Sequence, residues 1–478
     1  MMKYYLPKFV HLYNCDSEHF CLFNAITEET IYCKKNKVFV KSGMVSAEEK
    51  VVDVLLKYGM VVKEETEEDK IITLNIKKYK EASKKNLIRF LYIVPTVACN
   101  LQCTYCHIQN GKKERRFCVM KKQTLRNGLD IFKKYGGFDG HNSEIMFYGG
   151  EPFLESVFLI DALRIIREYS QEVKITIFTN GTLISKKIAE KLKEFDVYVI
   201  VSIDGKKESH DKARVYHDGT GSYEDVVIGY KNLQEQDIAV GISLVAGTHN
   251  IEMLERDVMH LTEEYNPLDI GISTLHLFKD ERNPNEVPME KMSEKLHLIQ
   301  LQMREKGVYI EHIFRKMRPF VEKSTRMYDC PSCNSKLLIT PWNTIGFCEA
   351  FMEEENYYYN VDTFDLVNCV GREEWKNRIP LTKIECYDCP AISVCGGGCP
   401  YDAYCESGNI CNKDKRRCLQ SRYMIEWLIR ELFSLLKESN KICEEIYIPD
   451  SSERKLLYGN IDLNNNIPLQ NYSIMNEV

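Results

Sequence analysis

The sequence predicts an α/β protein built around a partial (β/α)6 barrel, with a small α+β module before it and a cysteine-rich region after it. Two observations support this fold class. Strand-like and helix-like segments alternate from about residue 90 to about residue 305, which indicates a parallel sheet with helical crossovers. The 19 cysteines concentrate near residue 100 and between residues 330 and 418. We therefore expect four segments, at residues 1–85, 86–310, 325–440 and 441–478.

The composition is that of an ordinary globular protein with an unusual number of thiols. The chain has 478 residues, of which 44% are hydrophobic and 28% charged, and this length suits two or three domains. A formal net charge of −6 argues against nucleic acid or an anionic membrane as a partner. The sequence has neither a signal peptide nor an apolar stretch long enough to span a bilayer, so we expect a cytoplasmic protein. Clustered cysteines in such a protein point to metal binding or catalysis rather than disulfides.

The first segment, residues 1–85, begins with short β-prone stretches and continues with a helical pattern over Ala47–Tyr58, which Gly59 ends. The charged stretch Lys63–Lys70 is expected to be a solvated loop or linker.

The second segment contains six strand candidates and the helical patterns between them. Chemistry in such a barrel is built at the carboxyl ends of the strands. The strand candidates are Leu91–Val97, Glu144–Tyr148, Lys174–Thr179, Val197–Ile203, Ala239–Val245 and Leu268–His276. Helical patterns include Val157–Tyr169, Lys186–Phe195 and Tyr223–Gln234.

The last two segments differ in character. Residues 325–440 are dense in Cys and Gly, as expected of a region organised by metal, and a helix over Gln420–Lys437 closes them. The tail, residues 441–478, is polar, and we assign it no chemistry.

Three cysteines follow the first strand candidate in the order Cys99-Asn-Leu-Gln-Cys103-Thr-Tyr-Cys106. A [4Fe–4S] cluster takes four ligands, so a loop that supplies three thiolates leaves one iron open to a small molecule. The alternatives are a zinc site that also uses His107, which the spacing favours less because zinc sites typically use two CxxC pairs or a Cys and His set, and buried core thiols.

Polar or glycine-rich turns close the next three strand candidates. They read Gly149-Gly150-Glu151-Pro152, Thr179-Asn180-Gly181 and Ser202-Ile-Asp204-Gly205, and Arg214 follows the last of them. Each turn alone would suit a protein surface. Their shared position at the strand ends favours a binding site.

The motifs CNLQCTYC, GGEP, TNG and SIDG, in this order, resemble the radical S-adenosylmethionine (SAM) superfamily over about residues 90–305. The resemblance implies a radical SAM barrel in which Cys99, Cys103 and Cys106 hold a SAM-binding [4Fe–4S] cluster. It also implies that the strand-end residues surround SAM: Gly149, Gly150 and Glu151 at its amino group, Arg214 at its carboxylate, Thr179, Asn180 and Ser202 at its ribose or methionyl part, and Tyr105 and Leu275 at its adenine.

The later cysteines, with the spacing C-x2-C-x5-C-x3-C over Cys386–Cys399, resemble the SPASM domain, which carries two auxiliary [4Fe–4S] clusters. The usual glycine before the Cys348 position is Asn343 here, a residue that also tolerates left-handed backbone angles. The resemblance implies a first auxiliary cluster on Cys348 and Cys399 with Cys330, Cys333 or both. It implies a second cluster on Cys386, Cys389, Cys395 and Cys418. Spacing alone would also fit two zinc ribbons.

The resemblance further implies an enzyme that removes hydrogen from its substrate with a 5′-deoxyadenosyl radical and takes electrons from a flavodoxin or ferredoxin. Glu349, directly after Cys348, matches the position of a proposed catalytic base in related sulfatase-maturating enzymes, although a structural role explains it as well.

SPASM enzymes act largely on peptides, and the N-terminal segment resembles the winged-helix module with which peptide-modifying enzymes bind a leader peptide at a sheet edge. The leading hypothesis is a maturase that installs a thioether or carbon–carbon cross-link in a ribosomally made precursor (a RiPP maturase). A sulfatase-maturating enzyme that forms formylglycine from Cys or Ser, and a noncatalytic metal-organised module, are the alternatives.

Overall fold

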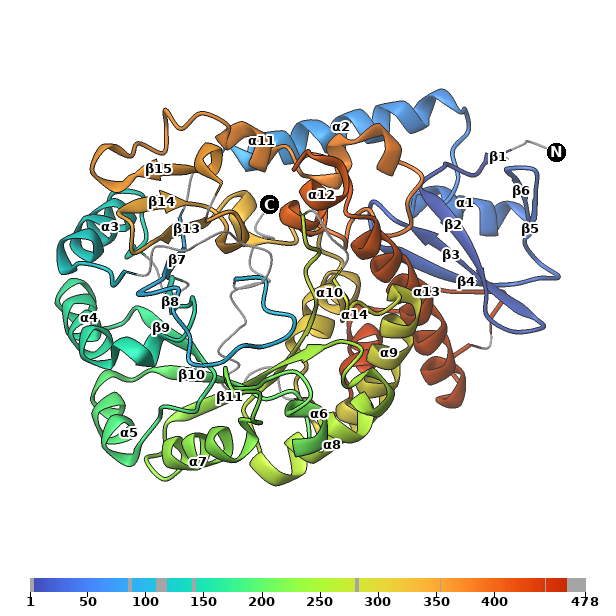
Figure 1. The fold of residues 1–478 in the computed structure, drawn as a ribbon. Helices are drawn as coiled ribbons and strands as arrows, with labels where there is room; N and C mark the ends of the chain where they lie inside the picture. The colour runs from blue at the N-terminus through green and yellow to red at the C-terminus, as the bar shows by residue number, and fades with distance from the viewer. Residues whose placement is uncertain are drawn as a thin grey trace.

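A nine-stranded sheet runs through the centre of the protein, in the order β12-β11-β10-β9-β8-β7-β13-β14-β15 (Figure 1). The structure is a computed structural model that describes residues 4–84, 88–108, 118–139, 143–279, 283–352, 354–442 and 444–461. Its first six strands are parallel and follow one another in chain order. These strands are β7 (Phe90–Ile93), β8 (Glu144–Phe147), β9 (Lys174–Thr179), β10 (Tyr198–Ser202), β11 (Ala239–Ala246) and β12 (Ile270–Thr274).

The strands follow a curve, and helices cover its outer side (Figure 1). Each of the six predicted strands is present within a few residues of its expected position, because each is an apolar run that the sheet buries. The helices of this part are α3 (Lys122–Lys134), α4 (Ser156–Tyr169), α5 (Lys186–Leu192), α6 (Lys207–His210), α7 (Tyr223–Gln234), α8 (Leu254–Tyr265), α9 (Met289–Lys306) and α10 (Glu311–Glu322).

The cysteine-rich region extends the same sheet. Strand β13 (Lys336–Ile339) pairs in parallel with β7, with Lys336 opposite Phe90, and β14 (Thr344–Gly346) and β15 (Tyr358–Asn360) continue antiparallel. Three strands between residues 336 and 360 are therefore part of the central sheet. Asn343, in the turn between β13 and β14, has a φ of 59°, the left-handed conformation expected at this position. The helices here are α11 (Arg372–Lys376), α12 (Pro400–Ser407) and α13 (Lys415–Glu438).

The N-terminal part consists of two small antiparallel sheets and two helices. One sheet has the order β1-β6-β5 and the other the order β16-β4-β3-β2. Its elements are β1 (Tyr4–Tyr5), β2 (Val10–Asn14), β3 (His19–Asn24), β4 (Glu29–Lys34), β5 (Phe39–Lys41), β6 (Met44–Ser46), α1 (Glu49–Lys57) and α2 (Thr66–Ser83). The coarse expectation of strands followed by helices is met, whereas the likeness to a winged helix stays a prediction.

One expectation about the N-terminal segment was wrong, and part of the polar tail packs against the rest of the protein. The charged stretch Lys63–Lys70 is not a linker throughout, because α2 begins at Thr66 and its first turn carries three acidic side chains, which suit a helix N-terminus. The tail also folds back as far as residue 461. Its strand β16 (Ile446–Tyr447) pairs with β4, and Arg454 of α14 (Ser451–Arg454) is buried and donates to the backbone oxygens of Phe320 and Glu28. The rest of the tail lies outside the described residues.

Across the part of the chain that the structure describes, no helix combines the length and the apolar character needed to cross a bilayer.

Candidate active site

A cavity at the carboxyl ends of β7–β12 gathers the residues predicted around the first cluster and SAM. We call it the strand-end cavity. All of the predicted residues except Glu151 line it: Cys99, Cys103, Tyr105, Cys106, Gly149, Gly150, Thr179, Asn180, Ser202, Arg214 and Leu275. The turns that close consecutive parallel strands are thus brought together at one edge, as the barrel pattern predicts.

Two glycines bring the turn after β8 against the cysteine loop. A Cβ on Gly149 would lie 2.6 Å from the backbone oxygen of Thr96, and one on Gly150 would lie 2.0 Å from that of Ala98. Gly149 also has a φ of 132°, which side chains disfavour. The close approach allows the Gly150 amide to donate to Thr96 O (3.1 Å) and the Glu151 amide to donate to Ala98 O (2.8 Å).

Glu151 does not line the cavity, and its contact with the amino group of SAM stays a prediction. The carboxylate is fully buried and accepts hydrogen bonds from the Phe153 amide (3.0 Å), the Thr179 hydroxyl (2.8 Å) and the Asn180 amide (2.7 Å). Burial raises its pKa to about 7. Glu151 therefore ties the end of β8 to the end of β9.

Asp204 is the centre of a buried charge network that the sequence analysis did not predict. Its carboxylate lies 3.0 Å from Nε of Arg214 and 3.3 Å from Nε2 of His249, and it accepts from the Val245 amide (2.9 Å) and the Tyr105 hydroxyl. Burial alone would raise the pKa of Asp204, but Arg214 and His249 outweigh burial and hold that pKa well below its usual range. Arg214 thus lines the cavity with its charge already partly balanced.

Contacts of the Tyr105 ring hold this residue in place. Its ring stacks on His249 with centroids 5.4 Å apart, and the Arg214 guanidinium lies 5.5 Å from the ring centroid. These contacts fix the backbone between Cys103 and Cys106. The prediction for Tyr105 concerned only its backbone, and the acidic partner of its hydroxyl was not foreseen.

The three thiols of the strand-end cavity suit a metal cluster. Burial raises the pKa values of Cys99 and Cys103 to about 12, so without metal these thiols are protonated, and bound iron would replace the protons. The Cys99 sulfur also accepts from the Leu101 amide (3.4 Å) and from Nδ2 of Asn180 (3.7 Å). Donors of this kind stabilise a thiolate, so the donor set fits a cluster bound by three cysteines.

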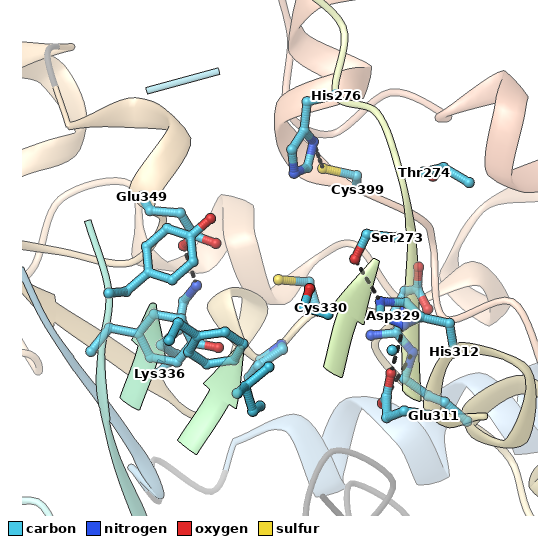
Figure 2. Close-up of a pocket in the computed structure, with 18 of the residues that line it drawn as sticks. Ser273, Thr274, His276, Glu311, His312, Asp329, Cys330, Lys336, Glu349 and Cys399 are labelled. Carbon is cyan, nitrogen blue, oxygen red and sulfur yellow. Dashed lines mark hydrogen bonds and ion pairs between the residues drawn. The ribbon is translucent and has the colours of Figure 1, made fainter. Parts of the chain in front are cut away.

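A second cavity adjoins the first, and we call it the inner cavity (Figure 2). The two share six lining residues: Tyr148, Phe178, Ser243, Ser273, Thr274 and His276. The inner cavity is also lined by Cys330 and Cys399, two of the predicted ligands of the first auxiliary cluster. A molecule in the inner cavity would therefore lie next to both the strand-end cavity and these two thiols.

Glu349 lines the inner cavity and forms a buried ion pair. Its carboxylate accepts from Nζ of Lys336 at 2.6 Å, and Nζ also lies 4.3 Å from the centroid of the Tyr92 ring (Figure 2). Burial alone would raise the pKa of Glu349, but Lys336 outweighs it and lowers that pKa to about 2. Glu349 is thus ionised near neutral pH and faces the cavity as an acceptor.

The four cysteines predicted for the first auxiliary cluster lie near one another. The charges of Cys330 and Cys348 would each raise the pKa of Cys399, and that of Cys330 would raise the pKa of Cys333. Cys330 and Cys399 line the inner cavity, whereas Cys333 and Cys348 are buried beside it. The ligand sets considered above, with Cys330, Cys333 or both, stay open.

The second auxiliary group is brought together by its own small cavity, which Cys386, Cys389, Cys395 and Cys418 line jointly. A hydrogen bond between two of these thiols lowers the pKa of Cys395 to about 6 and raises that of Cys418. Nε of Arg422 donates to the Cys389 sulfur at 3.5 Å. Four thiols around one cavity match the four ligands that a closed [4Fe–4S] cluster needs.

Residues 93–261 match the radical SAM superfamily. The chain contains a radical SAM domain. It is 24% identical over 384 residues to the radical SAM cyclopropyl synthase TigE of Paramaledivibacter caminithermalis, a match that covers 74% of this chain and 78% of the relative. It is 30% identical over 165 residues to a cysteine-type anaerobic sulfatase-maturating enzyme of Clostridium novyi, covering 33% of this chain and 43% of that enzyme.

Two solved structures share the fold at low sequence identity. Native anSMEcpe with bound AdoMet has a TM-score of 0.62 and 16% identity, with 73% of this chain and 99% of that chain covered. Streptococcus suis SuiB bound to S-adenosylmethionine has a TM-score of 0.55 and 16% identity, with 85% and 99% covered. The chain therefore combines a radical SAM domain with a cysteine-rich region that follows it.

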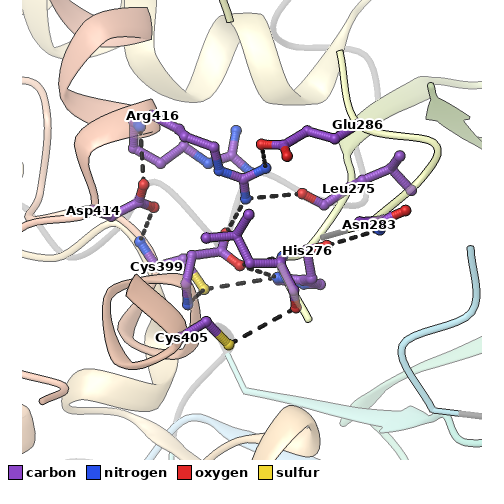
Figure 3. A network of polar contacts seen from close by, with 12 residues as sticks. Leu275, His276, Asn283, Glu286, Cys399, Cys405, Asp414 and Arg416 are labelled. Carbon is purple, nitrogen blue, oxygen red and sulfur yellow. Dashed lines mark hydrogen bonds and ion pairs between the residues drawn. The ribbon is translucent and has the colours of Figure 1, made fainter. Parts of the chain in front are cut away.

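A polar network connects the radical SAM domain to the cysteine-rich region at the rim of the two cavities (Figure 3). Asp402 of α12 accepts from the Leu277 amide (2.9 Å), lies 3.2 Å from Nδ1 of His276 and pairs with Arg416 at 2.8 Å. Arg416 also donates to the backbone oxygen of Leu275 (3.0 Å). Nδ1 of His276 lies 3.9 Å from the Cys399 sulfur, so the network holds a predicted cluster ligand beside the segment that follows β12.

Proposed function

We propose that this radical SAM enzyme matures a ribosomally made precursor peptide by installing a thioether or carbon–carbon cross-link. The observation that carries the proposal is the continuity of the two cavities, which share six lining residues. A substrate residue in the inner cavity would lie next to both the strand-end cavity and the thiols of Cys330 and Cys399. That arrangement suits a reaction that begins with hydrogen removal and ends with electron acceptance.

Solved relatives of the fold support a peptide as the substrate. SuiB has been solved with the precursor peptide SuiA, and anSMEcpe with the Kp18Cys peptide. Both have the fold of this chain, with TM-scores of 0.52 and 0.62. We extend the peptide class, but none of the particular sequences, to this protein.

Three [4Fe–4S] clusters and SAM are the proposed cofactors. Cys99, Cys103 and Cys106 would hold the first, Cys330, Cys333, Cys348 and Cys399 are the candidates for the second, and Cys386, Cys389, Cys395 and Cys418 would hold the third. With SAM bound, the first cluster supplies the 5′-deoxyadenosyl radical that removes a substrate hydrogen.

The protein's own residues would orient the substrate and receive its proton. The aromatic side chains of Tyr92, Tyr148 and Phe178 line the inner cavity and would exclude water from a reacting residue. Glu349 faces the same cavity, and we place it as the acceptor of the proton that the substrate loses on oxidation. Because Lys336 lowers the pKa of Glu349 to about 2, the carboxylate is a weak base while the ion pair is intact, and proton transfer to it would require the pair to loosen.

The remaining parts of the proposal concern partners and segments. Residues 1–85 would bind the leader peptide, residues 86–310 would form the radical SAM barrel and residues 325–440 would carry the auxiliary clusters. A flavodoxin or ferredoxin would supply electrons, and the enzyme would work in the cytoplasm.

The alternative is a sulfatase-type maturase that forms formylglycine, which the 30% identity to the Clostridium novyi enzyme favours. One experiment distinguishes the two functions. The reconstituted enzyme is given short peptides encoded beside its gene and, in parallel, a sulfatase-derived peptide, and the masses are compared. Loss of two hydrogens from a neighbouring peptide supports the proposal. An aldehyde formed only on the sulfatase peptide would instead establish the alternative.

Glu349→Gln tests the proposed base in the same assay. The glutamine keeps the shape but cannot take a proton, so cleavage of SAM should persist while cross-linked product falls at least tenfold. Equal loss of both activities would refute a role specific to proton removal.

A further inference from the structure

The deep end of the inner cavity carries a buried carboxylate that no other part of the account uses. Asp269 immediately precedes β12 and lines the cavity together with Gly271 and Ser273, which alternate along the same strand. Ser273 also lines the strand-end cavity. At the usual rise of a strand, Asp269 lies about 13 Å further along the barrel than Ser273.

One oxygen of Asp269 is satisfied and the other is free. The Tyr198 hydroxyl donates to Oδ1 at 2.6 Å, whereas Oδ2 is buried and has no hydrogen-bond partner among the described residues. The arrangement is built into the sheet, because a Cβ on Gly241 would lie 1.9 Å from the Tyr198 hydroxyl oxygen and 2.4 Å from Oδ1. A glycine at position 241 therefore makes the Tyr198–Asp269 pair possible.

Asp269 also differs from the other carboxylates of the inner cavity in its charge balance. Glu349 pairs with Lys336 at 2.6 Å, Asp329 with Lys316 at 3.2 Å and Glu311 with Arg315 at 3.9 Å. For Asp269, no cationic side chain lies within ion-pair distance among the described residues, and burial, with a smaller contribution from its neighbour Glu311, raises its pKa to about 7. The deep end of the cavity thus has an acidic group that lacks a matching cation, and a bound cation would favour its ionised form.

We propose that Asp269 binds a cationic N–H donor of the substrate, the ammonium of a lysine or the guanidinium of an arginine close to the residue that reacts. Such a group would donate to the free Oδ2 and supply the missing positive charge, while its aliphatic stem would pass Ile200, Ile242 and Gly271. The identity of the substrate as a peptide rests on the proposed function. The cation site itself does not.

Binding is tested on the holoenzyme without any peptide. Thermal unfolding is followed under anaerobic conditions at rising concentrations of n-butylammonium chloride, with n-butanol and sodium butyrate at matched ionic strength as comparisons. Because a ligand that binds only the native state raises the unfolding temperature, the cation alone should stabilise the wild type. Asp269→Asn, which keeps an acceptor for Tyr198, should weaken the apparent affinity at least tenfold.

Glu28→Gln is the matched control. Glu28 is also a buried carboxyl with unpartnered oxygens among the described residues, but it does not line the inner cavity. This variant should respond to n-butylammonium like the wild type. An equal response of Asp269→Asn, or equal stabilisation by n-butanol, would overturn the proposal.

A crystal soak keeps the proposal testable if Asp269→Asn does not fold. Wild-type crystals soaked in n-butylammonium should show the nitrogen about 3 Å from Oδ2 of Asp269. A cation found elsewhere, with this oxygen unoccupied, would refute the site. Neither the thermal unfolding measurement nor the crystal soak involves turnover. The cation site can therefore be refuted while the peptide-maturase assay succeeds, and it can be supported while that assay fails.

Discussion

Nε of Arg214 lies 3.0 Å from Oδ2 of Asp204 at the wall of the strand-end cavity. Both side chains are buried, and Asp204 also accepts a hydrogen bond from the hydroxyl of Tyr105, which lies in the cysteine loop. The pair therefore links the turn after β10 to the loop that carries the three predicted cluster ligands. Its geometry leads directly to a first prediction.

Asp204→Asn should weaken both the fold and SAM binding. The variant leaves Arg214 buried without its countercharge, which costs about 3–5 kcal/mol in a buried pair. We expect a lower unfolding free energy and at least a tenfold higher Kd for SAM, measured by urea unfolding and equilibrium binding. Asp218→Asn, at an exposed turn that follows Arg214, is the control and should change neither. Unchanged SAM affinity in Asp204→Asn would contradict the role of the network.

Lys336→Met should destabilise the protein more than Lys336→Met combined with Glu349→Gln. The single change leaves Glu349 charged and uncompensated beside Cys348, at a cost of about 3–5 kcal/mol. The double change removes both charges and should recover much of that loss. Unfolding in urea measures both, and strictly additive effects would show that the 2.6 Å pair is not coupled.

The buried carboxyl of Glu144 predicts an unusual pH dependence. Burial raises its pKa from 4.5 to about 7, so the native state holds a proton that the unfolded chain releases between these values. Stability should therefore fall as pH rises from about 4.5 to 7, by roughly 3 kcal/mol at most. Glu144→Gln should be more stable than the wild type at pH 8 and equal to it near pH 4.5. If the exposed Glu190→Gln gave the same gain, burial of Glu144 would not be the cause.

Cys395→Ala should remove one cluster and leave the others. Three four-iron clusters amount to about twelve irons per chain after anaerobic reconstitution, so the variant should retain about eight and still bind SAM. Cys405→Ser is the control, because its thiol donates to the Leu277 backbone oxygen and lies outside the four-cysteine cavity. Zinc in place of iron in the wild type, or no iron loss in Cys395→Ala, would contradict the cluster assignment.

Much of the fold follows from local sequence pattern. The strands β7–β12 are short apolar runs with polar or glycine-rich ends. The apolar runs predict the strands, and the polar ends predict the edge of the sheet at which the site forms. Helix α2 was missed because its first residues are strongly charged and only Ile72 and Tyr79 are buried. The pairing of β16 with β4 joins residues more than 400 positions apart and leaves no local signal.

The site residues that belong to short sequence motifs were predicted, whereas those that depend on contacts between distant segments were missed. Cys99, Gly149 and Asn180 belong to short recognisable runs, and they line one cavity as expected. Asp402 and Asp269 have no such run around them, and their roles depend on partners from other elements, His276 and Tyr198. Glu151 lies within its motif, yet only the structure shows that protein donors take up its carboxylate.

The most direct test of the central claim is the intact mass of a peptide encoded beside the gene, after co-expression with this enzyme. The account predicts a loss of two hydrogens for each cross-link, accompanied by 5′-deoxyadenosine. It also predicts an unchanged peptide when Cys99, Cys103 and Cys106 are all replaced by serine. An enzyme that cleaves SAM, leaves every such peptide unchanged and forms formylglycine on a sulfatase peptide would contradict the claim.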